Sequence, residues 1–431
     1  MNFLRRVGNV DQPEPIRRQL SNGLLLLAEP VPGVPSLALG AWIRSGSQHE
    51  TNDMMGAAHF IEHLVFKGTR KRSAYQIAQK LEALGGQVDA FTTKETTCFH
   101  ARIFAGHRRS AANILGELLS DATFPRPEVE KERQVIVEEI HAYEDTPEEF
   151  VFDLATEKIW DGHSMGHSIL GRLETLKAMG TRDLQKFHRD HYTRPNMIIT
   201  AAGNVDVDRL VDEIEASFRL PTRQHRNGLR PLPDFVPTTT HLDRDLQQTS
   251  ICLMGRGPSA TDETRHAAAI LHTILGAGMS SRLFQKVREV HGLAYSVYSY
   301  MEVLRESGIF CIYMAVEPKE AKRAVRLVGR ELRKVRDKGV KKWELEAAKA
   351  QLLTQLFLSY ESMFERVSRL AYDEMYYGTQ LPVRRMVEEI VSVTPEQIRD
   401  VADRLLRPES FALVSAGPGT VNAPSLEDLD A

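Results

Sequence analysis

A run of five residues, His59-Phe60-Ile61-Glu62-His63, constrains the fold of this chain more than any other segment. His59 and His63 are four positions apart, so on an α-helix they lie on one face, one turn from each other. The next three residues, Leu64-Val65-Phe66, are apolar, which indicates that the helix is buried. Because two imidazoles and a carboxylate are costly to bury without partners, the segment predicts a helix that grips a metal ion.

The order of these residues favours hydrolytic chemistry. Glu62 stands one position before the second histidine, where it can take a proton from a metal-bound water instead of binding the metal. This is the reverse of the H-E-x-x-H motif of zinc peptidases, and the same chemistry is available to it. The alternative is a helix whose histidines are ordinary polar surface residues, and the apolar flanks argue against it.

A catalytic zinc site needs a third protein ligand and one open position. The best candidate for the third ligand lies in the segment 127–143, which is predicted to be a helix that begins at a proline. Four of its residues recur in steps of four, three and four and so share one stripe, namely Glu132, Ile136, Glu139 and Tyr143. Two carboxylates on such a stripe are unusual unless a cation lies opposite. Taken alone, however, the segment is better explained as an ordinary charged surface helix.

With these two segments the chain resembles the pitrilysin/insulinase family of inverted-motif zinc peptidases. It is most similar to the half-length branch that includes mitochondrial processing peptidase and its bacterial relatives. Glu139 follows His63 by 76 residues, which fits that branch. The resemblance spans roughly 15–417 and implies that His59, His63 and Glu139 bind one Zn²⁺ per chain. It also implies Glu62 as the general base and Glu132 as an acid that orients or polarises the site.

The resemblance further implies two substrate-binding elements. The first is a strand at an open sheet edge, onto which a peptide adds as an extra strand, formed by Asp89, Ala90, Phe91 and Thr92. Relatives often have Asn at the first of these positions, and an ionised Asp cannot donate a hydrogen bond to a substrate carbonyl. On the residues alone, an ordinary half-buried strand explains this segment equally well.

The second implied element is the pair Arg288 and Tyr295, seven positions apart. The resemblance implies that both reach the cleavage site and that the Tyr295 hydroxyl stabilises the developing oxyanion. Without the resemblance, Tyr295 would be interpreted as a strand core residue and Arg288 as a surface residue of a helix.

Composition sets the remaining limits. A chain of 431 residues, 42% hydrophobic and 26% charged, is expected to form two or more globular domains. The net charge of −3 and the lack of a Lys/Arg-rich run give no case for a nucleic-acid partner. Three cysteines without C-x-x-C spacing are expected to be reduced core residues. We see no membrane span and, in residues 1–11, no apolar signal region, so a bacterial-type cytoplasmic enzyme is expected, although a chain trimmed of a leader would look the same.

The pattern of elements predicts an α+β fold. Strands are expected at 24–28, 36–43, 87–103 and 197–203, with a helix over 74–84 that ends at a Gly-Gly pair. Four prolines mark a linker over 221–240 between a metal-bearing domain, 1–220, and a second domain, 241–431. The second half repeats the first, with strands near 249–254 and 294–300 and a helix over 264–275, but lacks the metal motif. The resemblance implies two similar domains, each a mostly antiparallel sheet packed with helices, that form half of a clamshell.

These observations predict a zinc-dependent endopeptidase that cuts flexible peptides or unstructured, targeting-type segments inside a closed dimeric chamber. We expect a homodimer in which Arg288 and Tyr295 of one chain complete the metal site of the other. Two alternatives remain. The chain could be a non-catalytic structural or regulatory subunit, or a catalytic subunit that requires a sister chain.

Overall fold

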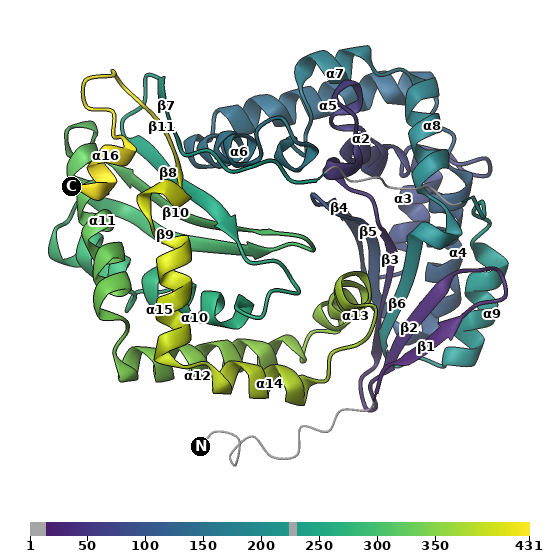
Figure 1. Ribbon diagram of the computed structural model, residues 1–431. Helices are drawn as coiled ribbons and strands as arrows, with labels where there is room; N and C mark the ends of the chain where they lie inside the picture. Colours follow the sequence, from purple (N-terminus) through teal and green to yellow (C-terminus); the bar gives the residue numbers. More distant parts are fainter. Residues whose placement is uncertain (1–13, 224–230) are drawn as a thin grey trace. The chain divides into compact units, whose positions relative to one another are not determined.

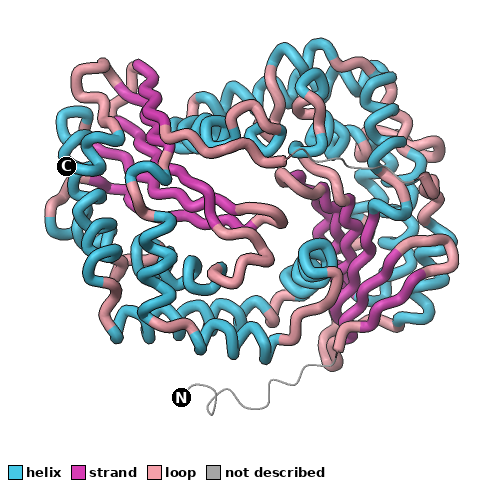
Figure 2. Tube along the Cα trace, in the orientation of Figure 1, coloured by secondary structure: helices cyan, strands magenta, loops and turns pink. Residues whose placement is uncertain are grey.

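The computed structural model describes residues 14–223 and 231–431, which form two compact units. Among these residues, the first unit comprises 14–141, 167–223 and 357–384. The second comprises 142–166, 231–356 and 385–431. In both units, a sheet (magenta in Figure 2) is packed with helices (cyan), as an α+β fold requires. Residues 1–11, on which the expectation about a leader rests, lie outside the described residues.

The sheet of the first unit has six strands in the order β1-β2-β6-β3-β5-β4 (Figure 1). The strands are β1 Ile16–Gln19, β2 Leu25–Pro30, β3 Ser36–Ile43, β4 Gln87–Thr92, β5 Thr97–Phe104 and β6 Met197–Gly203. The β2–β6 pair is parallel and the other pairs are antiparallel. β4 is therefore an edge strand, and no other described strand pairs with its outer side.

The helices of the first unit come mainly from the first half of the sequence. They are α2 Ala57–Leu64, α3 Ala74–Glu82, α4 Arg108–Asp121, α5 Arg126–Glu144, α7 Leu173–Ala178, α8 Thr181–His191, α9 Val207–Ser217 and α13 Met363–Tyr377. The last three residues of α5 are grouped with the second unit. α2 packs on β4 and β5, which places the H-x-x-E-H helix beside the open edge of the sheet.

The sheet of the second unit repeats this plan in the order β7-β11-β8-β10-β9. Its strands are β7 Thr238–Asp243, β8 Thr249–Gly257, β9 Ala294–Val303, β10 Gly308–Val316 and β11 Ala412–Gly417. As in the last five strands of the first sheet, one parallel pair is followed by three antiparallel pairs. β9 thus occupies the edge position that β4 has in the first unit, and the expected similarity of the two domains is confirmed.

The helices of the second unit come mainly from the second half of the sequence. They are α6 Pro147–Trp160, α10 Arg265–Gly276, α11 Ala321–Lys338, α12 Lys342–Ser359, α14 Val383–Ser392, α15 Pro395–Leu405 and α16 Leu426–Asp430, together with a π-helical turn at Phe284–Val290. The last three residues of α12 and the first two of α14 are grouped with the first unit. α10 follows β8 just as α2 follows β3, but its two histidines have other partners. His266 Nε2 lies 2.9 Å from a Glu389 oxygen, and His272 Nδ1 lies 2.8 Å from the Ser299 hydroxyl.

Each unit takes one helix from the other half of the sequence. α13 packs on β2, β3 and β6 of the first sheet, and α6 packs on β8 and β11 of the second. β3 and β8, and β6 and β11, hold equivalent places in the two sheets, so the two helices cover equivalent strands. The compact units therefore differ from the boundaries 1–220 and 241–431 expected from the sequence, because the sheet faces are completed by exchanged helices.

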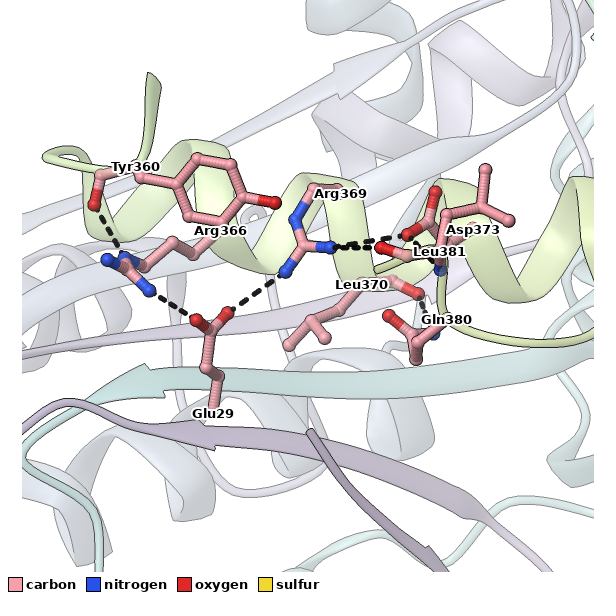
Figure 3. Close-up of polar contacts among 8 residues, drawn as sticks. All are labelled: Glu29, Tyr360, Arg366, Arg369, Leu370, Asp373, Gln380 and Leu381. Atoms are coloured by element: carbon pink, nitrogen blue, oxygen red, sulfur yellow. Dashed lines mark hydrogen bonds and ion pairs between the residues drawn. The ribbon is translucent and has the colours of Figure 1, made fainter. Parts of the chain in front are cut away.

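Apolar contacts and buried charges hold α13 on the first sheet. Trp42 of β3 is fully buried, and its ring centroid lies 5.4 Å from that of Tyr372 on α13. Glu29, at the end of β2, is buried and forms ion pairs with Arg366 and Arg369 of the helix (Figure 3). Removing one partner of such a buried pair costs several kcal/mol, about 3–5, so this contact fixes where α13 lies.

Cys98, Cys252 and Cys311 are all buried, in agreement with their expected place in the core. Within 14–223 and 231–431, none of the helices is long and apolar enough to cross a membrane.

Candidate metal centre

The helix that bears the motif begins at a tightly packed turn. Gly56, its N-cap, has φ +91° and approaches Gly171 so closely that a Cβ would lie 2.7 Å from the carbonyl oxygen of Leu170. The buried carboxylate of Glu50 accepts hydrogen bonds from the N–H groups of Gly56 and Ala58, at 2.8 and 2.7 Å. These are N–H groups that a helix start leaves without partners. Burial raises the pKa of Glu50 to about 8, although both hydrogen bonds act to lower it.

The two histidines of α2 converge with Glu139 of α5. The Glu139 Oε2 atom lies 3.8 Å from His59 Nε2 and 4.0 Å from His63 Nε2. The ligand atoms of the three residues all lie within 4.8 Å of one another, and they form the only such group of metal-binding side chains in the described residues. Glu138, one position earlier on α5, is exposed.

The other ring nitrogen of His63 faces Glu132, about two turns before Glu139 on α5. His63 Nδ1 lies 3.2 Å from Glu132 Oε2. Because a carboxylate can only accept, this hydrogen bond requires the imidazole proton on Nδ1, and Nε2 is then free to bind a metal. Lys67 Nζ lies 2.8 Å from the second oxygen of Glu132, so the buried carboxylate has both a cation and an imidazole as partners.

Burial also favours the neutral form of His59, which can bind a metal. Burial, together with the nearby His63, lowers the pKa of His59 to about 3. The ring is therefore neutral at physiological pH, which is the form that binds metals. Two imidazoles and a carboxylate on converging helices fit the donor set of a catalytic zinc site, which leaves a fourth position open.

Glu62 lies beside this group without taking part in it. Its Oε2 atom accepts a hydrogen bond of 2.6 Å from the hydroxyl of Thr92, the last residue of β4. Burial raises the pKa of Glu62 to about 7. The Thr92 hydrogen bond opposes this shift, whereas the negative charges of Glu139 and Asp89 add to it. A carboxylate with a pKa near the working pH is suited to accept and return protons.

The edge strand β4 is built differently on its two faces. Thr92 points to α2, whereas Phe91 packs against Trp42, with ring centroids 5.8 Å apart. Phe91 also lies 6.4 Å from the ring of Phe364 on α13. The Asp89 side chain accepts a hydrogen bond of 2.8 Å from the N–H of Ala90. Asp89 thus caps a backbone donor of its own strand, a role that the sequence does not reveal.

Arg288 and Tyr295 belong to the second unit and contact each other. The Arg288 guanidinium donates a hydrogen bond of 3.0 Å to the Tyr295 carbonyl and lies 4.8 Å from the centre of its ring. The Tyr295 side chain is 78% exposed on the edge strand β9, so it is not a strand core residue.

Two residues of the centre were missed from the sequence. Glu50 lies six positions before Gly56, too far upstream to match a helix-capping pattern. Lys67 lies four positions after His63, and this spacing, placed next to a predicted buried acid, could have indicated its role.

Two known protein families match parts of this chain. Residues 27–172 match the family described as Insulinase (Peptidase family M16), and residues 180–352 match the family described as Peptidase M16 inactive domain. The uncharacterized zinc protease YmxG of Bacillus subtilis is 35% identical over 95% of this chain and 99% of its own length. An uncharacterized zinc protease of Rickettsia felis is 31% identical over 90% of this chain and 94% of its own length.

Solved structures share the fold. A protease from Helicobacter pylori has a TM-score of 0.87 at 19% identity, covering 95% of this chain and all of that one. A peptidase M16 inactive domain from Pseudomonas fluorescens has the same TM-score at 20% identity, covering 94% of this chain and 98% of that one. The chain therefore belongs to the half-length branch of the insulinase family, peptidase family M16, and its relatives identify it as a zinc peptidase of that family.

Proposed function

We propose that this chain is a zinc-dependent endopeptidase that hydrolyses peptide bonds in flexible peptides or unstructured segments. The observation that carries this proposal is the convergence of His59 Nε2, His63 Nε2 and Glu139 Oε2 beside the carboxylate of Glu62. A zinc ion held by these three ligands would supply a Lewis acid that polarises the scissile carbonyl and lowers the pKa of water.

The other residues of the centre have distinct roles in this proposal. Glu62 takes the proton of the attacking water and delivers it to the leaving amine, and burial, which raises its pKa above that of an ordinary carboxyl group, suits it to both steps. Glu132 holds His63 in the tautomer whose Nε2 is free to bind. Thr92 fixes the Glu62 carboxylate through its hydroxyl.

The substrate is proposed to add to the open edge of β4. An edge strand can pair with any extended peptide through main-chain hydrogen bonds, with little regard for its side chains. Thr92 contacts Glu62, so a peptide on this edge passes directly by the proposed base. Folded proteins have no free extended segment to offer, which is why we propose flexible peptides and unstructured segments as substrates.

The first experiment measures bound zinc together with cleavage of a quenched fluorescent peptide library, for the wild type and for Glu62→Gln. The proposal expects about one zinc per chain in both proteins and loss of activity in the variant alone. Zinc without turnover in either protein would instead indicate a catalytic subunit that needs a sister chain. A folded chain without zinc would overturn the proposal.

We further propose a homodimer in which Arg288 and Tyr295 of one chain act at the metal centre of the other. The exposed Tyr295 ring, held by Arg288 on an edge strand, supports a role in binding beyond the fold of its own unit. Mixing Glu62→Gln chains with Tyr295→Phe chains should restore activity if the two sites work in trans. Confirmed subunit exchange without rescue would contradict this arrangement.

The expected cytoplasmic location stays a prediction.

A further inference from the structure

A pocket of about 690 Å³ lies at the far end of the β4 edge from the metal centre. It belongs entirely to the first unit and is lined by the Gly85-Gly86 turn that leads into β4, by the start of β3, by the end of β5, and by the chain from the last turn of α12 to the start of α13. Its apolar lining includes Phe104, Leu358 and Met363. Gly86, which lines the pocket, directly precedes β4, so the pocket lies next to the start of the strand on which the peptide is proposed to lie.

Two residues at this pocket are unusual for a surface. The Phe104 side chain is 61% exposed and the Leu358 side chain is 57% exposed, although both are large and apolar. They come from segments more than 250 positions apart, yet they line the same hollow. Exposed apolar side chains that gather at one concave site are typical of a binding surface.

The charges at the pocket indicate what it selects. One cation, Arg102, and one anion, Glu361, line its wall, and the Arg102 guanidinium donates a hydrogen bond of 2.9 Å to the side chain of Gln87. With one charge of each sign, the pocket favours neither an acidic nor a basic ligand. Its remaining selectivity comes from apolar surface, which an aromatic or branched aliphatic side chain would cover.

We propose that this pocket is a subsite for an apolar side chain of the substrate, distant from the bond that is cut. β4 runs from Gln87 at the pocket to Thr92 at the proposed base, a distance of about 17 Å at roughly 3.4 Å per residue. A peptide that pairs antiparallel with β4, the more stable arrangement, runs in the opposite direction. Its residues C-terminal to the cut therefore approach the pocket, and the side chain that enters it lies about four to six positions downstream.

This inference rests on the proposed peptidase function, and one peptide series separates the two. Internally quenched peptides carry Phe or Ser at each position up to eight residues on either side of a mapped cleavage bond. With the wild type, kcat/KM should be about tenfold higher for Phe than for Ser at four to six positions downstream, mainly through a lower KM. No such preference should occur upstream of the cut.

Substitutions at the pocket complete the test. In Phe104→Ser and in Leu358→Ser, the ratio of kcat/KM for the Phe peptide to that for the Ser peptide at the downstream positions should fall close to one. The control is Tyr75→Ser, which removes another exposed aromatic ring of the first unit (72% exposed) outside the pocket, and it should keep the preference. Cleavage with no dependence on the downstream residue, or a preference upstream of the cut, would overturn the subsite and leave the peptidase standing. No cleavage of any peptide by the zinc-loaded chain would overturn both.

Discussion

His59 and Glu62 are three positions apart on α2, and burial shifts their pKa values in opposite directions. It lowers the pKa of His59 to about 3 and raises the pKa of Glu62 to about 7, because in both cases the charged form loses its hydration. The imidazole is thereby kept neutral, as a metal ligand must be, and the carboxylate gains basicity. One apolar helix thus provides both a ligand and a base.

The Thr92 hydroxyl should set the pH at which the proposed base becomes active. Glu62 must lose its proton to act, so kcat/KM should rise with pH, with a midpoint below about 7 in the zinc-loaded chain because a nearby cation favours the carboxylate. Thr92→Val removes a donor that lowers the pKa of Glu62. The midpoint should therefore move to higher pH, and on the acid side of it kcat/KM should fall by about tenfold, the loss of one charge-assisted hydrogen bond.

A matched variant distinguishes the hydroxyl from the shape of the side chain. Thr92→Ser keeps the donor and should keep the midpoint of the wild type. The two variants should have similar kcat/KM well above pH 8, where Glu62 is ionised in both. Equal midpoints for the valine and serine variants, measured from pH 5 to pH 9, would contradict the role of this hydrogen bond.

Glu132 should act on zinc affinity through His63. Glu132→Gln removes the charge that accepts from His63 Nδ1, so zinc binding should weaken by about 10–100-fold. Competition with a chelator of known affinity measures this change directly. The exposed neighbour Glu138 provides the control, since Glu138→Gln should bind zinc as the wild type does. Unchanged affinity in Glu132→Gln would mean that the contact has no orienting role.

Local patterns identified most of this centre, and distant contacts account for what was missed. His59, Glu62 and His63 follow from one helix period, whereas Glu139, which lies within 4.0 Å of both histidines, was implied only by the resemblance to the insulinase family. Glu50 could not be found in this way, because it reaches Gly56 through a loop whose course depends on the packing of the whole unit.

At the scale of the element, the start of α2 should tolerate no side chain at Gly56. Gly56→Ala would require a left-handed backbone conformation, costing about 1–2 kcal/mol, and would also force a methyl group against the carbonyl of Leu170. We expect a total loss of about 2–5 kcal/mol in the free energy of unfolding. Gly33→Ala is the matched control, because Gly33 has φ +83° but nothing within 4 Å of its Cβ position.

Urea unfolding of Gly56→Ala and Gly33→Ala measures how much free energy of unfolding each variant loses. The Gly33 variant should lose only the conformational part, about 1–2 kcal/mol. Equal losses in the two variants would show that the close approach of Gly56 to the 170–171 turn does not constrain the helix.

Alternation and turn residues predicted individual elements well. The strands expected at 36–43 and 197–203 have those bounds in the structure, and the helix expected over 127–143 is α5, Arg126–Glu144. The exchange of α6 and α13 was not predicted, because the periodicity of a helix does not reveal which sheet it covers. For α13, the sheet that it covers depends on ion pairs of Arg366 and Arg369 with Glu29, which is more than 330 positions away in the sequence.

At the scale of the whole molecule, the first unit should need a segment from the end of the chain. A fragment of residues 1–230 lacks α13, which covers an apolar face that includes Leu25, Leu27 and Trp42. We expect this fragment to bind a hydrophobic dye and to be digested rapidly by an added protease. A synthetic peptide of residues 357–384 should suppress dye binding and slow digestion.

The control peptide carries Arg366→Ala and Arg369→Ala, which remove both partners of the buried Glu29. It should protect the fragment much less, because an unpaired carboxylate would remain buried. A fragment that is stable without either peptide would contradict the exchanged-helix organisation.

The most direct measurement of the central claim is bound zinc and peptide turnover in two variants of adjacent residues on α5. Glu138→Gln changes an exposed carboxylate and should keep about one zinc per chain and full turnover. Glu139→Gln changes the carboxylate that faces His59 and His63, and should lower zinc affinity by more than about 100-fold and abolish turnover at low free zinc. Glu139→Gln chains that bind zinc and cleave peptides as the wild type does would contradict the metal centre proposed for this enzyme.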